Sequence, residues 1–290
     1  MSKVSVLTLT RHRTDFLKNL LNGLARSSRL PDECIVVHMN EPAQSLGQWP
    51  FPCHHHTLTS DTALPLTQAR NAAAKYASGD SLIFLDVDCI PSRTMVAAYE
   101  RACQAVPDSI AMAKVNYLSQ NARIDWTAPE PEAALRSQSK PHPMRNIHPV
   151  APLILEFDYG LFWSLSFGLT RSLFNLLGGF SDGYIGYGAE DTDFAWKAKA
   201  MGIPLLWVPD AIAYHQFHTS SVPPWHNFDS IVHNAQVFYA RWDKWPMESW
   251  LAAFAAKGYI EWTIAGSTLA VLERPLQARS LTLKNNVEKK

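Results

Sequence analysis

Apolar and polar positions along the first third of the chain follow the periods of strands and helices. Residues 4–10 and 33–39 are β-branched and apolar runs of the kind that forms buried strands. Apolar residues between these runs recur at the spacing of one helix face, namely Phe16, Leu17, Leu20, Leu21 and Leu24. A strand, a helix and a strand joined by short connections predict a parallel sheet covered by helices.

The same alternation continues to residue 106. Residues 67–79 predict a helix that begins at a threonine and ends at Gly79, and residues 80–88 predict a third strand. Residues 91–106 open with Pro and Ser and predict another helix. The segment 41–66 is rich in Pro, His and Thr and predicts a loop with one short strand near residues 54–60.

The second half has a weaker and then a sharper pattern. Residues 119–158 lack clear periodicity, and we expect a long mobile loop over a site. From residue 159 the pattern predicts a strand, a short helix ending at Gly178 and Gly179, a helix over 190–201 and a strand over 203–208. Residues 223–262 predict two helices. We therefore expect an α/β domain over 1–222 and a helical extension over 223–290 with a frayed end.

Composition narrows the class of protein. The 290 residues are 47% hydrophobic and hold 26 Lys and Arg against 26 Asp and Glu, which argues against a nucleic-acid partner. No stretch resembles a signal peptide or reaches the ~20 apolar residues of a membrane span, so a cytoplasmic protein is expected, with peripheral contact to the inner membrane face as an option. The four cysteines show no CxxC spacing and predict reduced thiols. The Trp-rich tail predicts helix packing, with an acceptor wall, an oligomer contact or a membrane anchor as alternatives.

The third predicted strand ends in two carboxylates, Asp86 and Asp88, with one valine between them. Residues two apart in an extended chain point to the same face, so both side chains should converge on one ligand. Two such carboxylates repel each other unless a cation neutralises them, and oxygen ligands suit Mg²⁺, Mn²⁺ or Ca²⁺. A triplet of this kind can also simply cap the next helix. Ligands of open α/β sheets bind at the carboxyl ends of strands, which favours a metal site here.

A second acidic group follows a Gly-rich loop in "GYGAEDTDF", residues 186–194. Acids at a helix N-terminus are favoured by the helix dipole alone, but Glu190, Asp191 and Asp193 exceed what capping needs. The spacing places Glu190 and Asp193 on one face and Asp191 elsewhere. One carboxylate can then hold a ligand while its neighbour acts as a general base.

Basic and imidazole side chains supply the remaining candidates. His215 and His218 follow the strand predicted over 203–208, and one of them can complete the metal site. A shell of carboxylate and imidazole favours Mn²⁺ over Mg²⁺. Arg70 lies early in the helix before the Asp86 strand and either contacts a phosphate or is an ordinary solvated residue.

Together these segments resemble the nucleotide-sugar glycosyltransferases of the GT-A fold, namely the family 2 group and, in the second half, the galactosyltransferase type. The resemblance lies in "VSVLTLTRHR", "ARNAAAKYASGDSLIFLDVDCIP" and "LFNLLGGFSDGYIGYGAEDTDFAWKAKAMG" and covers residues 3–218. It implies a Rossmann-like, mostly parallel sheet flanked by helices. It also implies a nucleotide-diphosphate-sugar donor, usually UDP-linked, a saccharide or lipid-linked acceptor, and inversion at the anomeric carbon.

The resemblance further implies roles for individual residues. Asp191 would be the base that deprotonates the acceptor hydroxyl, and Glu190 would bind the acceptor or the donor sugar. Asp88 would contact Mn²⁺ or Mg²⁺ together with His215 or His218, and Asp86 would contact the metal, the donor ribose or the donor sugar. The other expected contacts are Thr10, Arg11, Asn40, Glu41, Arg70 and Val87 for the donor, and Trp163 and Gly188 for the acceptor.

The sequence departs from the family pattern at two points. Family 2 enzymes usually carry an acid that reads uracil after the second strand, where this chain has "VVHMNEP", so Asn40 or Glu41 must substitute. The QxxRW signature of processive synthases is absent, which argues against a polymer synthase. Two alternatives remain: a sugar nucleotidyltransferase, which should have a Gly-rich loop after the first strand, and a non-catalytic sugar or nucleotide-sugar binder, which should have lost some of the acids.

Overall fold

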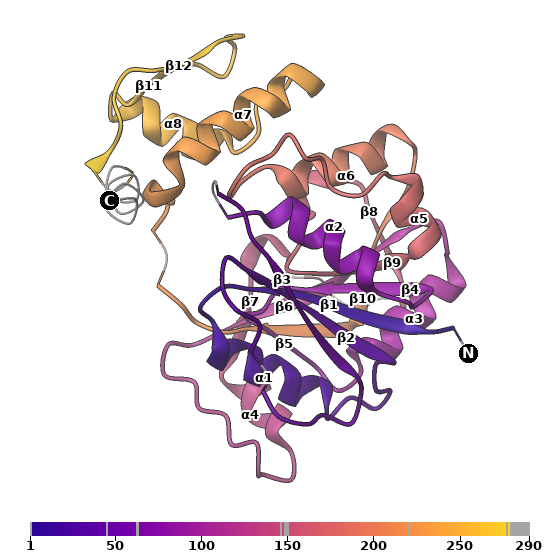
Figure 1. Cartoon of the computed structure of the whole chain (residues 1–290). Helices are drawn as coiled ribbons and strands as arrows, with labels where there is room; N and C mark the ends of the chain where they lie inside the picture. The colour runs from indigo at the N-terminus through magenta and orange to yellow at the C-terminus, as the bar shows by residue number, and fades with distance from the viewer. Residues whose placement is uncertain are drawn as a thin grey trace.

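A single mixed sheet forms the centre of the protein (Figure 1). The structure is a computed structural model and describes residues 2–44, 46–61, 64–145, 147, 151–219, 221–276 and 278. The strand order is β3-β2-β1-β4-β9-β6-β10-β5, with β7 paired to β6 and β8 to β10. The strands are β1 (Val4–Thr10), β2 (Glu33–Met39), β3 (Cys53–Leu58), β4 (Ser81–Leu85), β5 (Cys89–Pro91), β6 (Ile110–Leu118), β7 (Ser139–Pro141), β8 (Ile154–Glu156), β9 (Ser166–Thr170) and β10 (Leu205–His215).

Most of these strands run in one direction. β3, β2, β1 and β4 are mutually parallel, β9 is inserted antiparallel between β4 and β6, and β10 is parallel to β6. The carboxyl ends of β1, β2, β4, β6 and β10 therefore share one edge with the beginning of β9. This confirms the predicted α/β class and a mostly parallel sheet, and it fixes the edge at which ligands should bind.

Helices cover both faces of the sheet, as the alternating pattern predicts. One apolar core lies under α2 (Leu66–Tyr76), α5 (Arg171–Leu176) and α6 (Glu190–Ala200), and the other under α1 (Thr14–Leu24) and α3 (Met95–Ala105). The core strands β1, β2 and β4 are buried along their whole length. This continuous burial is why they appear in the sequence as unbroken apolar runs.

Two predicted boundaries are wrong for local reasons. The helix expected over 67–79 ends at Tyr76, and Gly79 instead allows close packing, because a Cβ there would lie 2.7 Å from the Ser5 amide nitrogen. The strand expected over 80–88 ends at Leu85. The Cys89 amide donates to the Asp86 carbonyl at 2.8 Å and closes a turn, so Asp86 and Asp88 are not in extended chain.

The segment 119–158 is more regular than expected. Its described part contains α4 (Pro131–Ser137), a short helical turn η1 (Pro143–Arg145), and the strands β7 and β8, which extend the sheet through β6 and β10. These strands are only three residues long, and their pairing is non-local, so no period marks them in the sequence. The described part of this segment is therefore not one continuous loop, contrary to the expectation from the sequence.

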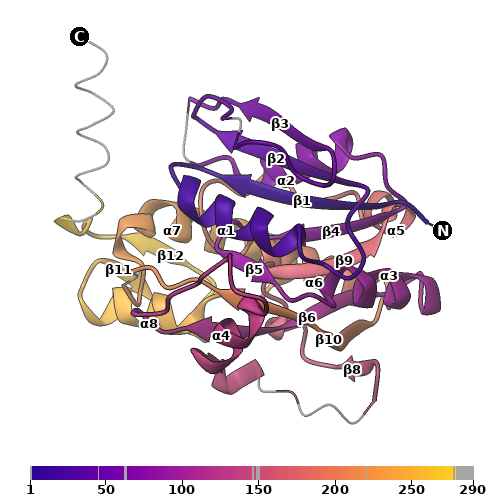
Figure 2. The same cartoon turned by 90° about the horizontal axis from the view of Figure 1, so that it is seen from below.

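The C-terminal part forms a small lobe beside the edge where the parallel strands end (Figures 1 and 2). It contains a turn η3 (Trp225–Asn227), the helices α7 (Phe228–Trp242) and α8 (Glu248–Ala256), and a hairpin of β11 (Ile260–Trp262) and β12 (Leu269–Val271). The helices were predicted and the hairpin was not. Aromatic residues fill the lobe's own core, which confirms the packing interpretation of the tail. The end expected to be frayed lies outside the described residues from 279 on.

Candidate active site

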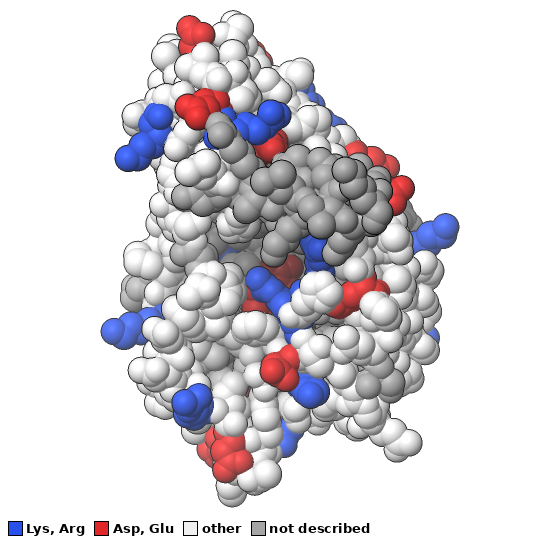
Figure 3. All heavy atoms as spheres, turned by 60° about the vertical axis from the view of Figure 1, so that its left-hand side comes forward, with Lys and Arg blue, Asp and Glu red and all other residues white. Residues whose placement is uncertain are grey.

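One edge of the sheet collects nearly every side chain singled out in the sequence. The turns after β1, β2 and β4 carry Arg13, Glu41 and Asp88, and β10 brings His215 to the same edge. On the face in Figure 3, acidic and basic side chains lie together in a hollow near the middle. The site is thus assembled from segments more than a hundred residues apart in the chain.

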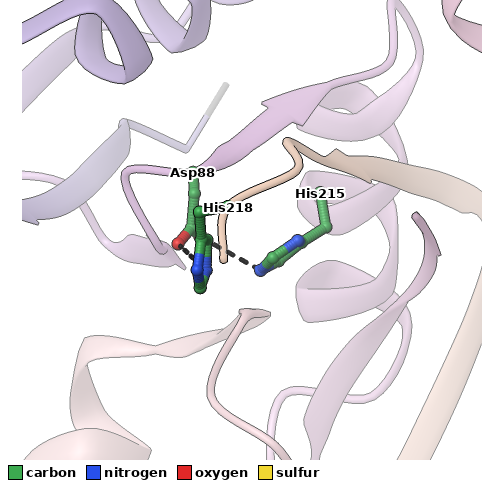
Figure 4. Close-up of side chains that lie close together, drawn as sticks. All are labelled: Asp88, His215 and His218. Atoms are coloured by element: carbon green, nitrogen blue, oxygen red, sulfur yellow. Dashed lines mark ion pairs between the residues drawn. The ribbon is translucent and has the colours of Figure 1, made fainter. Parts of the chain in front are cut away.

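Asp88, His215 and His218 form a cluster of potential metal ligands (Figure 4). One oxygen or nitrogen of each residue lies within 4.8 Å of the others. His215 Nε2 is 3.6 Å from Asp88 Oδ1, and His218 Nε2 is 3.4 Å from Asp88 Oδ2. Both histidines therefore reach Asp88, where the sequence left the choice between them open. Arg13 also forms an ion pair with Asp88 and was missed in favour of Arg11.

The surroundings keep Asp88 ionised. Burial opposes its charge, but the hydrogen bond from His218 and the charges of His215 and Arg13 outweigh burial and lower the pKa of Asp88 to about 2. The hydrogen bond to Asp88 raises the pKa of His218. Burial lowers the pKa of His215, which favours the neutral imidazole that a metal requires.

Arg70 joins the two acidic motifs. Its side chain is 6% exposed and lies 3.1 Å from Glu190 Oε1 and 3.7 Å from Asp86 Oδ1, and it donates to the Ser164 hydroxyl at 2.9 Å. The solvated interpretation of Arg70 is therefore wrong. Burial, together with the charges of Asp88, Glu190 and Asp191, raises the pKa of Asp86 to about 7 in spite of Arg70. Asp86 faces Arg70 and does not join the ligand cluster around Asp88.

Asp191 is the second residue of the helix α6 and follows Glu190, the partner of Arg70. One carboxylate oxygen accepts from the Ser164 amide at 3.3 Å and the other from the Thr192 amide at 2.7 Å. Burial and the charge of Glu190 raise the pKa of Asp191 to about 6. A carboxylate with this pKa is ionised at neutral pH and still basic enough to accept a proton.

A strained loop presents these acids. Gly186, Gly188 and Ala189 all have left-handed φ angles of +60°, +110° and +65°. A Cβ at Gly188 would also lie 2.8 Å from the Met247 sulfur. Both the backbone conformation and the available space therefore favour glycine at this position. The buried Asn234 of α7 donates to the carbonyls of Ile185 and Gly188 and accepts from the Ile185 amide. The C-terminal lobe thus holds the loop that precedes Glu190.

Asp193 has a different role from the one its spacing suggested. It is fully buried and contacts Arg241, the Trp242 indole nitrogen and the Ser181 hydroxyl. The structure does not bring Glu190 and Asp193 together on one ligand-facing surface, because Glu190 faces Arg70 instead. Asp193 therefore fastens α6 to the C-terminal lobe.

The other predicted contacts lie along the same edge. Glu41 is buried and accepts from the His12 amide at 2.6 Å, and Asn40 accepts from the Ser60 amide at 2.7 Å. Trp163 is partly buried and its ring covers the Arg145 guanidinium at 5.0 Å. Of the remaining donor candidates, Thr10 and Val87 are buried and Arg11 is exposed.

Comparison with known proteins identifies the family. The sequence model described as "Glycosyltransferase like family 2" matches residues 52–237, which includes the Asp88 cluster and the acids of α6. The chain belongs to this family. The name of the family points to glycosyl transfer, and the match does not support the nucleotidyltransferase alternative.

One curated relative is the validoxylamine A glucosyltransferase of Streptomyces hygroscopicus subsp. limoneus, which is 24% identical over 225 residues. The match covers 70% of this chain and 49% of the relative, so the chain spans about half the length of the curated relative it matches.

Solved structures of glycosyltransferases share the fold. GalNAc-T7, crystallised with UDP, GalNAc and Mn²⁺, superimposes with a TM-score of 0.63 at 14% identity over 89% of this chain and 51% of its own. S. aureus TarS 1–349 gives a TM-score of 0.53 at 16% identity over 82% of this chain and 65% of its own. The GT-A architecture expected from the sequence is therefore confirmed. Among the described residues, no helix combines the length and the apolar character needed to cross a bilayer.

Proposed function

We propose that the protein is a glycosyltransferase that depends on a divalent metal, uses a nucleotide-diphosphate-sugar donor, UDP-linked in the first instance, and inverts the anomeric carbon. The observation behind this proposal is the position of Asp191, whose pKa is raised to about 6, beside a cluster of three potential metal ligands. The acceptor would be a hydroxyl of a saccharide or of a lipid-linked saccharide. We also propose a domain boundary near residue 222, and a cytoplasmic location with contact to the inner membrane face when the acceptor is lipid-linked.

The donor atoms of Asp88, His215 and His218 suit Mn²⁺, because a carboxylate with two imidazoles is a mixed oxygen and nitrogen set. A divalent ion held there would neutralise charge on the diphosphate as it leaves. Arg13, which already pairs with Asp88, lies where it can contact the same phosphates.

Asp86 and Arg70 are proposed to orient the donor. Arg70 holds Asp86 on one side and Glu190 on the other, so the donor-facing turn and the acceptor-facing helix share one fixed guanidinium. Asp86 then accepts hydrogen bonds from the hydroxyls of the ribose or the transferred sugar. The turn after β2, with Asn40 and Glu41, would face the base.

Asp191 is proposed to take the proton of the acceptor hydroxyl. The Ser164 and Thr192 amides fix its two oxygens, which leaves the carboxylate in one orientation. Glu190, held by Arg70 and by the Gly188 amide at 2.9 Å, remains available to bind a sugar hydroxyl. Trp163 would support a sugar ring by stacking.

Donor turnover tests this function. The protein should hydrolyse or transfer from one donor of a panel of UDP-, GDP- and dTDP-sugars, with product that has the opposite anomeric configuration by NMR, and only with Mn²⁺ or Mg²⁺ present. Asp88→Ala should abolish metal-dependent turnover, and Asp191→Asn should reduce it by about 10²–10⁴-fold. Binding of a donor without any turnover would favour a non-catalytic binder. Full activity of Asp191→Asn would contradict the assigned base.

A further inference from the structure

Arg145 is an unusual residue in this molecule. It belongs to the turn η1 in the segment before β8, and it is 1% exposed. None of its three guanidinium nitrogens has a hydrogen-bond partner among the residues that the structure describes. Buried arginines nearly always form ion pairs or several hydrogen bonds, because an isolated buried charge is strongly destabilising.

Aromatic rings enclose this cation without satisfying it. The guanidinium carbon lies 5.0 Å from the Trp163 ring and 4.8 Å from the Trp207 ring. Cation–π contacts stabilise such a charge only in part, and they leave the N–H groups unpaired. Burial accordingly lowers the pKa of Arg145, although an arginine remains charged at any physiological pH.

The position of the charge points to the active site. Arg145 lies within electrostatic range of Tyr117, Tyr99, Cys89 and Asp191, of which the aspartate is the group that is charged at neutral pH. Cys89 adjoins Asp88, and the Tyr117 ring lies 4.8 Å from the ring of His215. The cation therefore lies near the segments that carry the proposed metal ligands and the proposed base, yet it forms an ion pair with none of these acids within the described residues.

We propose that Arg145 is a buried counter-charge for an oxyanion group of the bound substrates, of the phosphate or carboxylate class. This inference rests on the proposed function. Water does not reach the guanidinium, so its field crosses a medium of low dielectric and remains strong at the distance of the ligand. In the described part of the chain the charge has no hydrogen-bonded partner, and the bound anion supplies one. Phosphate from the donor diphosphate and carboxylate from an acidic sugar are the two sources.

The inference predicts opposite effects on stability and on binding. Arg145→Met removes an uncompensated charge and keeps an apolar side chain of similar length between the two tryptophans. The melting temperature of the unliganded variant should therefore rise. Its affinity for an anionic ligand should fall by about tenfold or more. A residue with a purely structural role would lower the melting temperature and leave binding unchanged.

Calorimetric titration with Mn²⁺ present separates the sources of the anion. If the partner is the diphosphate, Arg145→Met weakens UDP and inorganic pyrophosphate but leaves uridine unchanged. If the partner is a carboxylate, UDP binds as in the wild type, and UDP-glucuronate loses affinity relative to UDP-glucose. Arg145→Lys keeps the charge and should retain most of the affinity.

Arg171→Met is the matched control. Arg171 is a partly buried arginine whose Nε and Nη1 donate to the Gly79 and Ala74 carbonyls, so its loss should lower the melting temperature without changing any affinity. The inference would be overturned if Arg145→Met bound all these ligands as the wild type does, or if it failed to fold. If the wild type nevertheless binds UDP, such a result overturns the inference and leaves the proposed function standing. If the wild type binds neither UDP nor pyrophosphate, the proposed function falls as well.

Discussion

At the scale of single residues, the site contains two carboxylates with very different pKa values. Asp88, surrounded by Arg13, His215 and His218, has a pKa near 2, whereas Asp191, buried beside Glu190, has a pKa near 6. The first is a permanent anion suited to holding a cation. The second exchanges its proton close to neutral pH. Different neighbours thus give the same side chain two different chemical uses.

The metal assignment predicts graded losses of binding. Asp88→Asn should weaken Mn²⁺ binding most, because it removes the only anionic ligand of the cluster, and His215→Ala and His218→Ala should each weaken it by about 10–100-fold. Titration calorimetry measures the change. His54→Ala serves as the control, because His54 lies on the edge strand β3 with its side chain 51% exposed. Equal Mn²⁺ affinity in all four variants would contradict the assignment.

The raised pKa of Asp191 predicts a pH profile. A general base acts in its ionised form, so kcat/KM should rise as pH increases through about 6 and then level off. Asp191→Asn should lose this ascending limb along with most of the activity. The measurement is the pH–rate profile at saturating metal. A profile that stays flat from pH 5 to 8 would show that Asp191 is not the titrating base.

Local motifs revealed part of the site. Asp88 and His215 follow apolar runs, and Glu190 and Asp191 follow a Gly-rich loop, so short patterns suffice to find all four. Arg13 was missed because "RHR" offers two arginines and only the geometry of the turn after β1 selects the second. Ser164 and Arg145 were missed for another reason, since neither belongs to a motif and tertiary contacts alone bring them to the site.

At the scale of elements, the helix α6 depends on α7. Asn234 forms three hydrogen bonds to the backbone of the loop before α6, and Asp193 anchors the first turn of α6 to Arg241 and Trp242. Ala189 in this loop has a left-handed φ angle, which is unfavourable for a residue with a Cβ, so a partner outside the loop must hold it. The C-terminal lobe supplies that partner.

Loss of the Asn234 hydrogen bonds to this loop should impair both stability and catalysis. Asn234→Ala leaves buried backbone groups unpaired and should cost about 1–3 kcal/mol of unfolding free energy. It should also lower kcat, because Glu190 and Asp191 follow the loop directly. The control is Gln236→Ala, which removes one hydrogen bond of the same helix to the Leu269 carbonyl in the lobe itself. Chemical denaturation and steady-state kinetics give the two values, and an unchanged kcat in Asn234→Ala would refute the role.

Among the elements, long buried strands were predicted best. The bounds of β1 and β2 coincide with the expected ranges, because seven-residue apolar runs permit little else. β7, β8 and the C-terminal hairpin were missed because each has three-residue strands whose pairing depends on distant partners. The Asp86–Asp88 turn was mistaken for a strand because it follows an apolar run without a break.

At the scale of the whole molecule, the lobe and the sheet form one working unit. Asp193 and Asn234 connect α6 and its loop to α7, and α6 in turn lies on the same face of the sheet as α2. The lobe has its own aromatic core, yet its first helix completes the acid-bearing loop. The boundary proposed near residue 222 therefore separates two regions of the chain that contribute to the same site.

Arg70 gives this unit a thermodynamic consequence. One buried guanidinium serves Asp86, from the turn after β4, and Glu190, from the start of α6, so substitutions at the two acids should not be additive. Each single change, Asp86→Asn or Glu190→Gln, leaves Arg70 one partner and relieves the repulsion between the acids. The double variant removes both of its ion pairs, leaves the hydrogen bond to Ser164, and relieves that repulsion only once. A double-mutant cycle at pH 8 should therefore show an excess destabilisation of about 1 kcal/mol or more, while strict additivity would disprove the coupling.

Such coupling would mean that donor and acceptor recognition cannot be altered independently in this protein. Variants selected for a new donor should then need compensating changes a hundred residues away.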